Sequence, residues 1–175
     1  MLFRSALPAE LVPPFATGDV ATSGIGTVAR GTGLESSRRI AFRWGSKTEG
    51  EKNLVKCLGQ RVPAAIEPAK GAVYRYMHIL AAATKEAVTA GFTLQFDDRS
   101  EQYTSFQIGR WDGGAANDEE VAFAAGYIRT ASGAVADRPA SLYRYTIKIA
   151  EKKKLATIVL PNVPDVRIVA ITLEK

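Results

Sequence analysis

The sequence predicts an all-β protein, an antiparallel β-sandwich of jelly-roll type with about nine strands, from three observations. Short apolar or alternating runs recur at spacings near ten residues, with turn residues between them. One pair of runs has the pattern of a β-hairpin. No segment carries an apolar stripe at helical spacing over three turns. Many short strands spaced in this way are typical of sandwiches and jelly rolls.

The N-terminal part predicts no regular element. Residues 1–15 contain three prolines and no apolar run as long as a signal-peptide core, so we expect an extended arm. Five glycines between positions 18 and 33 fit neither a helical nor a strand period. Their order also matches neither the Rossmann nor the P-loop motif. We therefore expect residues 1–38 to form an arm and a Gly-rich loop packed on a sandwich of residues 39–175.

Four runs predict the first half of the sandwich. Residues 39–44 alternate, so Ile40, Phe42 and Trp44 share one face, which we expect to be core. Two short apolar runs and one long apolar run follow, and the long run predicts a buried strand. A connection should come next. Residues 81–90 could form one or two helical turns, which their Thr and Val residues disfavour. These runs and the connection are residues 54–58, 60–66, 73–83 and 84–91.

The hairpin comprises residues 92–96 and 102–108. Phe92, Leu94 and Phe96 alternate with polar residues, and the four residues between the runs are typical of turns. Prolines at positions 161 and 164 separate the last two predicted strands. The remaining strands are predicted over residues 121–127, 142–149, 155–160 and 166–173.

The composition excludes several classes of protein. A single cysteine excludes an internal disulfide framework, and a single histidine excludes a multi-histidine metal centre. The longest apolar run is too short for a transmembrane helix. Twenty-three Lys and Arg against 18 Asp and Glu give a net charge of +5, which favours anionic partners only mildly. The lysine triplet at 152–154 has no interleaved aromatic residue, so we expect neither nucleic acid nor a membrane as partner.

The second half of the chain resembles a known family. The stretch FTLQFDDRSEQYTSFQI, followed by Arg110, Trp111 and Asp112, and the closing stretches LYRYTIKI and LATIVLPNVPDVRIVAITLEK carry the resemblance. They are similar to the galactose-binding-like β-sandwich accessory domains of bacterial and fungal glycoside hydrolases. The acidic turn of those domains normally contains a glycine, which is absent here. The resemblance covers residues 39–175 and rests on structural motifs.

This resemblance implies a non-catalytic carbohydrate-binding or accessory module without an organic cofactor. Its partners would be a glycan and a catalytic hydrolase domain. Because no secretion signal is visible, two locations stay open: cytoplasmic, or extracellular if the chain is part of a longer secreted protein. These domains often hold a structural calcium ion between their first and last strands. On that analogy, Asp19 and Glu174 are the expected ligands, although calcium requires six or more oxygens.

Aromatic and charged residues near predicted strand ends are the candidate glycan ligands. Indole rings offer a platform for the flat C–H faces of sugars, and arginine and carboxylate groups can hold sugar hydroxyls. The alternatives are tryptophans that cap the core and ion pairs at the rim. The candidate ligand-binding residues are Trp111, Asp112, Arg110, Tyr127, Arg129 and Trp44.

Two other functions stay open. Tyr74, Tyr76 and His78 would share one strand face, where they could transfer protons in a small lyase-like enzyme acting on acidic glycans. The same spacing equally fits a half-buried sheet surface. The position of the single histidine in an apolar run argues against a Ser-His-Asp hydrolase triad. The remaining alternative is a purely structural or oligomerisation domain.

Overall fold

The structure is a computed structural model. It describes residues 28–30, 39–42, 54–64, 73–113, 119–125, 128–129, 135–136 and 140–175. Every regular element within these ranges is a β-strand, and no helix in them could cross a membrane. The predicted all-β sandwich is confirmed.

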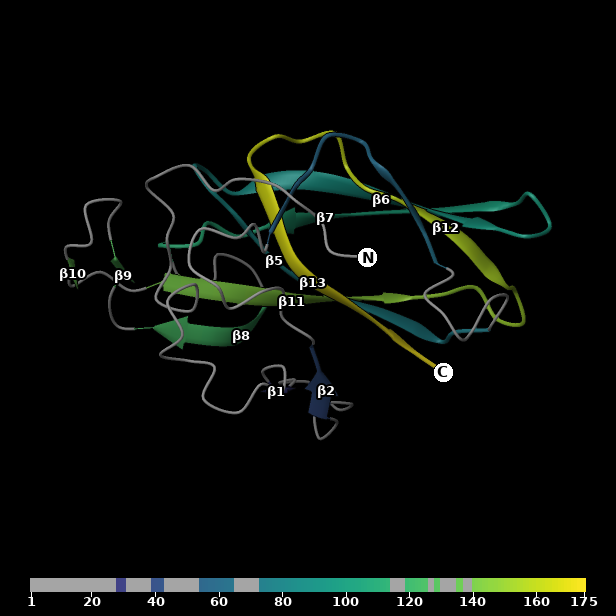
Figure 1. The fold of residues 1–175 in the computed structure, drawn as a ribbon, viewed down its shortest axis with the longest axis horizontal. Helices are drawn as coiled ribbons and strands as arrows, with labels where there is room; N and C mark the ends of the chain where they lie inside the picture. The colour runs from purple at the N-terminus through teal and green to yellow at the C-terminus, as the bar shows by residue number, and fades with distance from the viewer. Residues whose placement is uncertain are drawn as a thin grey trace.

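Two antiparallel sheets form the sandwich (Figure 1). The five-stranded sheet has the order β3-β13-β5-β11-β8, and the four-stranded sheet has the order β4-β12-β6-β7. The strands of the first sheet are β3 (Val55–Lys56), β13 (Val166–Glu174), β5 (Tyr76–Ala83), β11 (Ala140–Lys148) and β8 (Glu120–Ala125). Those of the second are β4 (Arg61–Pro63), β12 (Leu155–Val159), β6 (Val88–Phe96) and β7 (Glu101–Ile108).

Two short strand pairs complete the described elements. One pairs β1 (Val28–Arg30) with β2 (Arg39–Ala41), and the other pairs β9 (Ile128–Arg129) with β10 (Val135–Ala136). The expected Gly-rich irregular loop is therefore wrong at β1, because residues 28–30 form a ladder with β2. Ile40 and Phe42 are buried as expected, whereas Trp44 lies outside the described residues.

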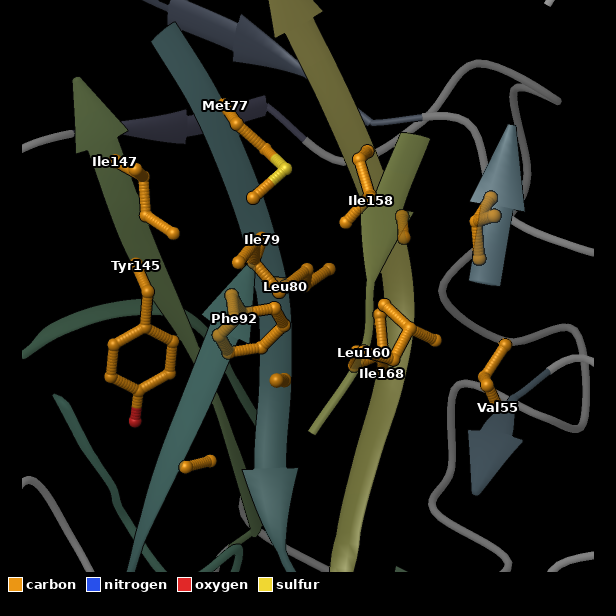
Figure 2. Close-up of a cluster of buried hydrophobic side chains, with 14 of the residues drawn as sticks. Val55, Met77, Ile79, Leu80, Phe92, Tyr145, Ile147, Ile158, Leu160 and Ile168 are labelled. Atoms are coloured by element: carbon orange, nitrogen blue, oxygen red, sulfur yellow. The ribbon is translucent and has the colours of Figure 1, made fainter. Parts of the chain in front are cut away.

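The core lies between the sheets, and β5, the central strand of the five-stranded sheet, contributes Met77 and Ile79 to it (Figure 2). Seven consecutive residues of β5, from Met77 to Ala83, are buried, so the outward-facing residues of this central strand are shielded as well as the inward-facing ones. From the opposite sheet, Phe92 stacks on Phe106, and Phe106 stacks on Tyr145 of β11. This column of rings joins the two sheets.

The predicted hairpin is confirmed, but its first strand is longer than expected. β6 begins at Val88, so the expected connection over residues 84–91 ends early, and no helical turn occurs there. Val88 to Gly91 pair with β7, and the Ala90 side chain is fully buried. The ladder thus satisfies the backbone hydrogen bonds that a helical turn would have made.

The turn after β11 is fastened to the hairpin turn. Lys153 Nζ lies 3.0 Å from Asp98 Oδ2 and 2.6 Å from Ser100 Oγ, and it lies over the Phe96 ring. Hydrogen bonds from Ser100, followed by that from Lys153, lower the pKa of Asp98 to about 2. The middle residue of the lysine triplet therefore holds two turns together.

Cys57 is fully buried, as its apolar surroundings predict. Burial raises the pKa of its thiol to about 12, although the Arg167 charge opposes this effect. Since the thiolate is the reactive form, we expect Cys57 to react with an aromatic disulfide reagent at pH 8 at least about 100-fold more slowly in the folded protein than in denaturant. Absorbance of the released thiolate measures both rates, and equal rates would show an accessible thiol.

Candidate functional site

The predicted Arg110-Trp111-Asp112 cluster lies directly after β7, where its backbone bridges other strands. Trp111 N donates to Ala83 O at 3.0 Å, and Ser141 N donates to Trp111 O at 2.6 Å. This segment therefore connects the end of β5 to the start of β11.

The side chains of this cluster interact mainly with one another and with the core. Arg110 Nε lies 2.6 Å from Asp112 Oδ1, and Arg110 Nη1 lies 3.7 Å from Glu86 Oε1. The indole of Trp111 is partly buried and packs against the core. Trp111 thus covers part of the core, and Arg110 and Asp112 form an ion pair with each other, as the alternatives to glycan binding predict.

The other predicted ligands are placed only in part. Trp44, Tyr127 and Asp19 lie outside the described residues, and only the backbone of Arg129 is described, in β9. Glu174 lies on β13, with Oε2 3.0 Å from His78 Nε2. Within the described ranges, no group of three or more His, Cys, Asp or Glu could hold a metal ion. The calcium ion, with Asp19 and Glu174 as its expected ligands, stays a prediction.

The outer face of the four-stranded sheet presents a set of side chains that sequence reasoning did not single out. Along β6, Phe92 and Leu94 point into the core, so the alternate residues point outward. Along β7, every second residue from Glu101 to Gln107 is exposed and points outward. We call this surface the Tyr103 face; it comprises Arg61, Thr89, Gly91, Thr93, Gln95, Glu101, Tyr103, Ser105, Gln107 and Thr157.

Tyr103 lies flat on this face. Its residue is 69% exposed, yet a Cβ placed on Gly91 would lie only 2.3 Å from the tyrosine Oη. The ring therefore crosses the backbone at Gly91, where only glycine leaves room for so close an approach. A glycine inside a strand, opposite a run that carries an outward tyrosine, is the sequence signal that could have indicated this arrangement.

A row of polar side chains lies beside the ring. Arg61 Nη2 donates to Gln95 Oε1, and Gln95 Nε2 donates to Glu101 Oε1 at 2.6 Å. Thr93 pairs with Tyr103, and Gln95 pairs with Glu101, so Gln95 and Glu101 form the next outward-facing pair along the strands. Arg61 reaches this pair from β4. Arg61 is positive and Glu101 is negative, so the row offers hydrogen-bond donors and acceptors without a net charge.

A second polar cluster lies on the outer face of the five-stranded sheet. The His78 residue is 5% exposed; its Nδ1 lies 3.0 Å from Thr146 Oγ1, and its Nε2 lies 3.0 Å from Glu174 Oε2. The rings of Tyr76 and His78 are 6.1 Å apart. Tyr74 precedes β5 and packs in the hydrophobic core, so two of the three residues of the predicted proton-transfer set lie together.

Burial governs the protonation of this cluster. It lowers the pKa of His78, while the hydrogen bond to Glu174 raises that pKa and the Arg144 charge lowers it. Arg144 forms an ion pair with Glu120, and burial raises the pKa of Glu120 against the opposing effect of Arg144. A neutral imidazole at pH 7 follows from the lowered pKa of His78.

The comparison with protein families gives one match. The family described as the AziU2-like beta-sandwich domain matches residues 33–175, which is most of the chain. A search among curated proteins finds no match. The family description agrees with the two packed sheets, and it supports the sandwich that the resemblance implied. The chain belongs to the AziU2-like β-sandwich domain family.

Proposed function

We propose that this protein is a carbohydrate-binding module whose binding surface is the Tyr103 face. The observation that carries the proposal is the exposed tyrosine ring lying flat over Gly91. Sugar rings have flat C–H faces that pack well on aromatic rings, and the Tyr103 ring needs no rearrangement to offer such a platform.

The polar row beside the ring supports the same function. Arg61, Gln95 and Glu101 already orient one another, so their remaining donors and acceptors are held in place for sugar hydroxyls. Neighbouring strands are about 4.8 Å apart, which is comparable to the size of one sugar unit. Because the charges of the row balance, the surface favours a neutral glycan over an acidic one. The face itself performs no chemistry.

The accessory role beside a catalytic hydrolase domain is part of the same proposal and rests on the family resemblance of residues 39–175. The Arg110-Trp111-Asp112 cluster is a second candidate platform for a glycan. Partial burial of Trp111 and the mutual ion pair of Arg110 and Asp112 favour the Tyr103 face over it.

Titration calorimetry on a glycan selected from an array tests the proposal. Tyr103→Ala should weaken binding by about 1–3 kcal/mol if sugar stacking compares with base stacking on aromatic rings. Tyr103→Phe keeps the platform and should bind nearly as well. Gly91→Ala keeps the tyrosine but displaces its ring from the sheet, so it should also lose affinity.

Trp111→Ala is the matched control, because it removes an aromatic ring at the other candidate platform. It should leave affinity unchanged. If Trp111→Ala abolishes binding and Tyr103→Ala does not, the glycan binds at the strand end and the Tyr103 face is excluded. An unmutated protein that binds no glycan on the array would favour the structural-domain alternative.

A further inference from the structure

The outer face of the five-stranded sheet contains a relay of carboxylate, imidazole and hydroxyl. Glu174 of β13, His78 of β5 and Thr146 of β11 stand on three adjacent strands. Both links of the relay measure 3.0 Å. The outermost group is an exposed threonine, whereas the histidine is buried.

The Glu174 carboxylate determines which nitrogen of His78 donates and which one accepts a hydrogen bond. An ionised Glu174 can only accept, so Nε2 of His78 carries the proton and donates it. In a neutral imidazole the other nitrogen then has a free lone pair. Nδ1 therefore accepts from the Thr146 hydroxyl, which is the arrangement in which a histidine can remove the hydroxyl proton.

A positive charge lies next to the hydroxyl. Arg144 precedes Thr146 by two residues on β11, so both side chains leave the same face of the sheet, about 7 Å apart along the strand. Its Nη2 contacts Glu120, while its buried Nε has no hydrogen-bond partner among the described residues. Because this Nε is buried, Arg144 acts on negative charge that develops beside the hydroxyl through the field of its guanidinium and not by a hydrogen bond from Nε.

We infer that Thr146, His78 and Glu174 form an acyl-transfer site for carboxylic esters, with Thr146 as the nucleophile. Thr146 Oγ1 attacks the ester carbonyl while its proton moves to His78 Nδ1. The alcohol leaves with that proton, and the acyl group stays on Thr146 as an ester. Water then hydrolyses this ester, releases the carboxylic acid and restores the hydroxyl.

Each residue has a distinct role in this step. His78 is the general base and then the general acid, and Glu174 is a positioning residue that holds the imidazole. Arg144 contributes the positive charge on the same face of β11. The charged and titratable groups near the imidazole come from four strands of the same sheet: Tyr76 of β5, Arg144 of β11, Glu174 of β13 and, through Arg144, Glu120 of β8.

Acylation by p-nitrophenyl acetate tests the inference with the full chain. Intact mass spectrometry should show one acetyl group added, and peptide mapping should place it on Thr146. Neutral hydroxylamine should remove it, because it is an ester. Acetylation of the exposed Lys148 instead would give an amide that resists hydroxylamine, and that outcome would overturn the proposal.

Matched variants separate chemistry from folding. Thr146→Val keeps the side-chain shape and should abolish the modification, and Thr146→Ser should restore it. His78→Gln should slow acylation by about 100-fold or more. Glu174→Gln should slow it as well, with partial recovery in Glu174→Asp. Thr84→Val, which alters a half-buried threonine just beyond the end of β5, should react like the unmutated protein.

The outcomes are independent of glycan binding. Tyr103→Ala should leave acylation unchanged, and Thr146→Val should leave glycan affinity unchanged, because the two residues lie on opposite sheets. Absence of acylation, or acylation of Thr146 at the same rate in His78→Gln, would show that the relay is only a satisfied hydrogen-bond network.

Discussion

Removal of residues 166–175 is expected to leave the protein unfolded or insoluble. These residues include all of β13, which lies between β3 and the central strand β5. Val166 and Ile168 are almost completely buried, and each such side chain contributes about 1.5–3 kcal/mol. Deletion would also leave one whole edge of β5 without backbone partners. The combined loss approaches a total stability of roughly 5–15 kcal/mol.

Circular dichroism during thermal unfolding measures this effect. Deletion of Lys175 alone is the control, since that residue is exposed and lies beyond β13. Ile168→Ala gives an intermediate point, with an expected cost of about 2–5 kcal/mol. A deletion of residues 166–175 that melted at the normal temperature would contradict the strand order described above.

Phe92→Ala should cost about 3–5 kcal/mol of unfolding free energy, the largest effect expected of a single substitution here. Phe92 is fully buried and begins the ring column that continues through Phe106 to Tyr145. Tyr145 Oη also accepts a hydrogen bond from Gly109 N at 2.8 Å. Since Tyr145 is on β11 and Gly109 follows β7, this bond adds a second link between the two sheets. Loss of the first ring would open a cavity at the contact between the sheets.

Urea unfolding followed by fluorescence would give the free energy. Ser105→Ala is a suitable control, because it removes an exposed side chain from β7 and should change stability by less than about 0.5 kcal/mol. A cost below about 1 kcal/mol for Phe92→Ala would mean that neighbouring side chains collapse into the space, and that the ring column does not join the sheets.

The alternation of apolar and polar residues, together with the turn residues between the runs, was enough to predict the sandwich. The Phe92, Leu94 and Phe96 pattern identified the buried face of β6, and prolines 161 and 164 marked the boundary between the last two strands. These signals are local, since each strand's own residues decide which side is apolar. The additional residues of β6 were missed because Ala90 and Gly91 are residue types that strands disfavour, and pairing with β7 decides their conformation.

The candidate sites depended on neighbours that no local pattern reveals. Sequence reasoning placed His78 with tyrosines of its own strand, whereas its nearest polar partners are Thr146 and Glu174, which are 68 and 96 residues away. Likewise, the sequence showed Tyr103 only as one residue of an alternating strand. The structure adds that its ring lies flat over Gly91 of the neighbouring strand. The residue types and the apolar faces of the strands follow from the sequence. Strand order and register decide which side chains meet, because cross-strand contacts form between segments far apart in the chain.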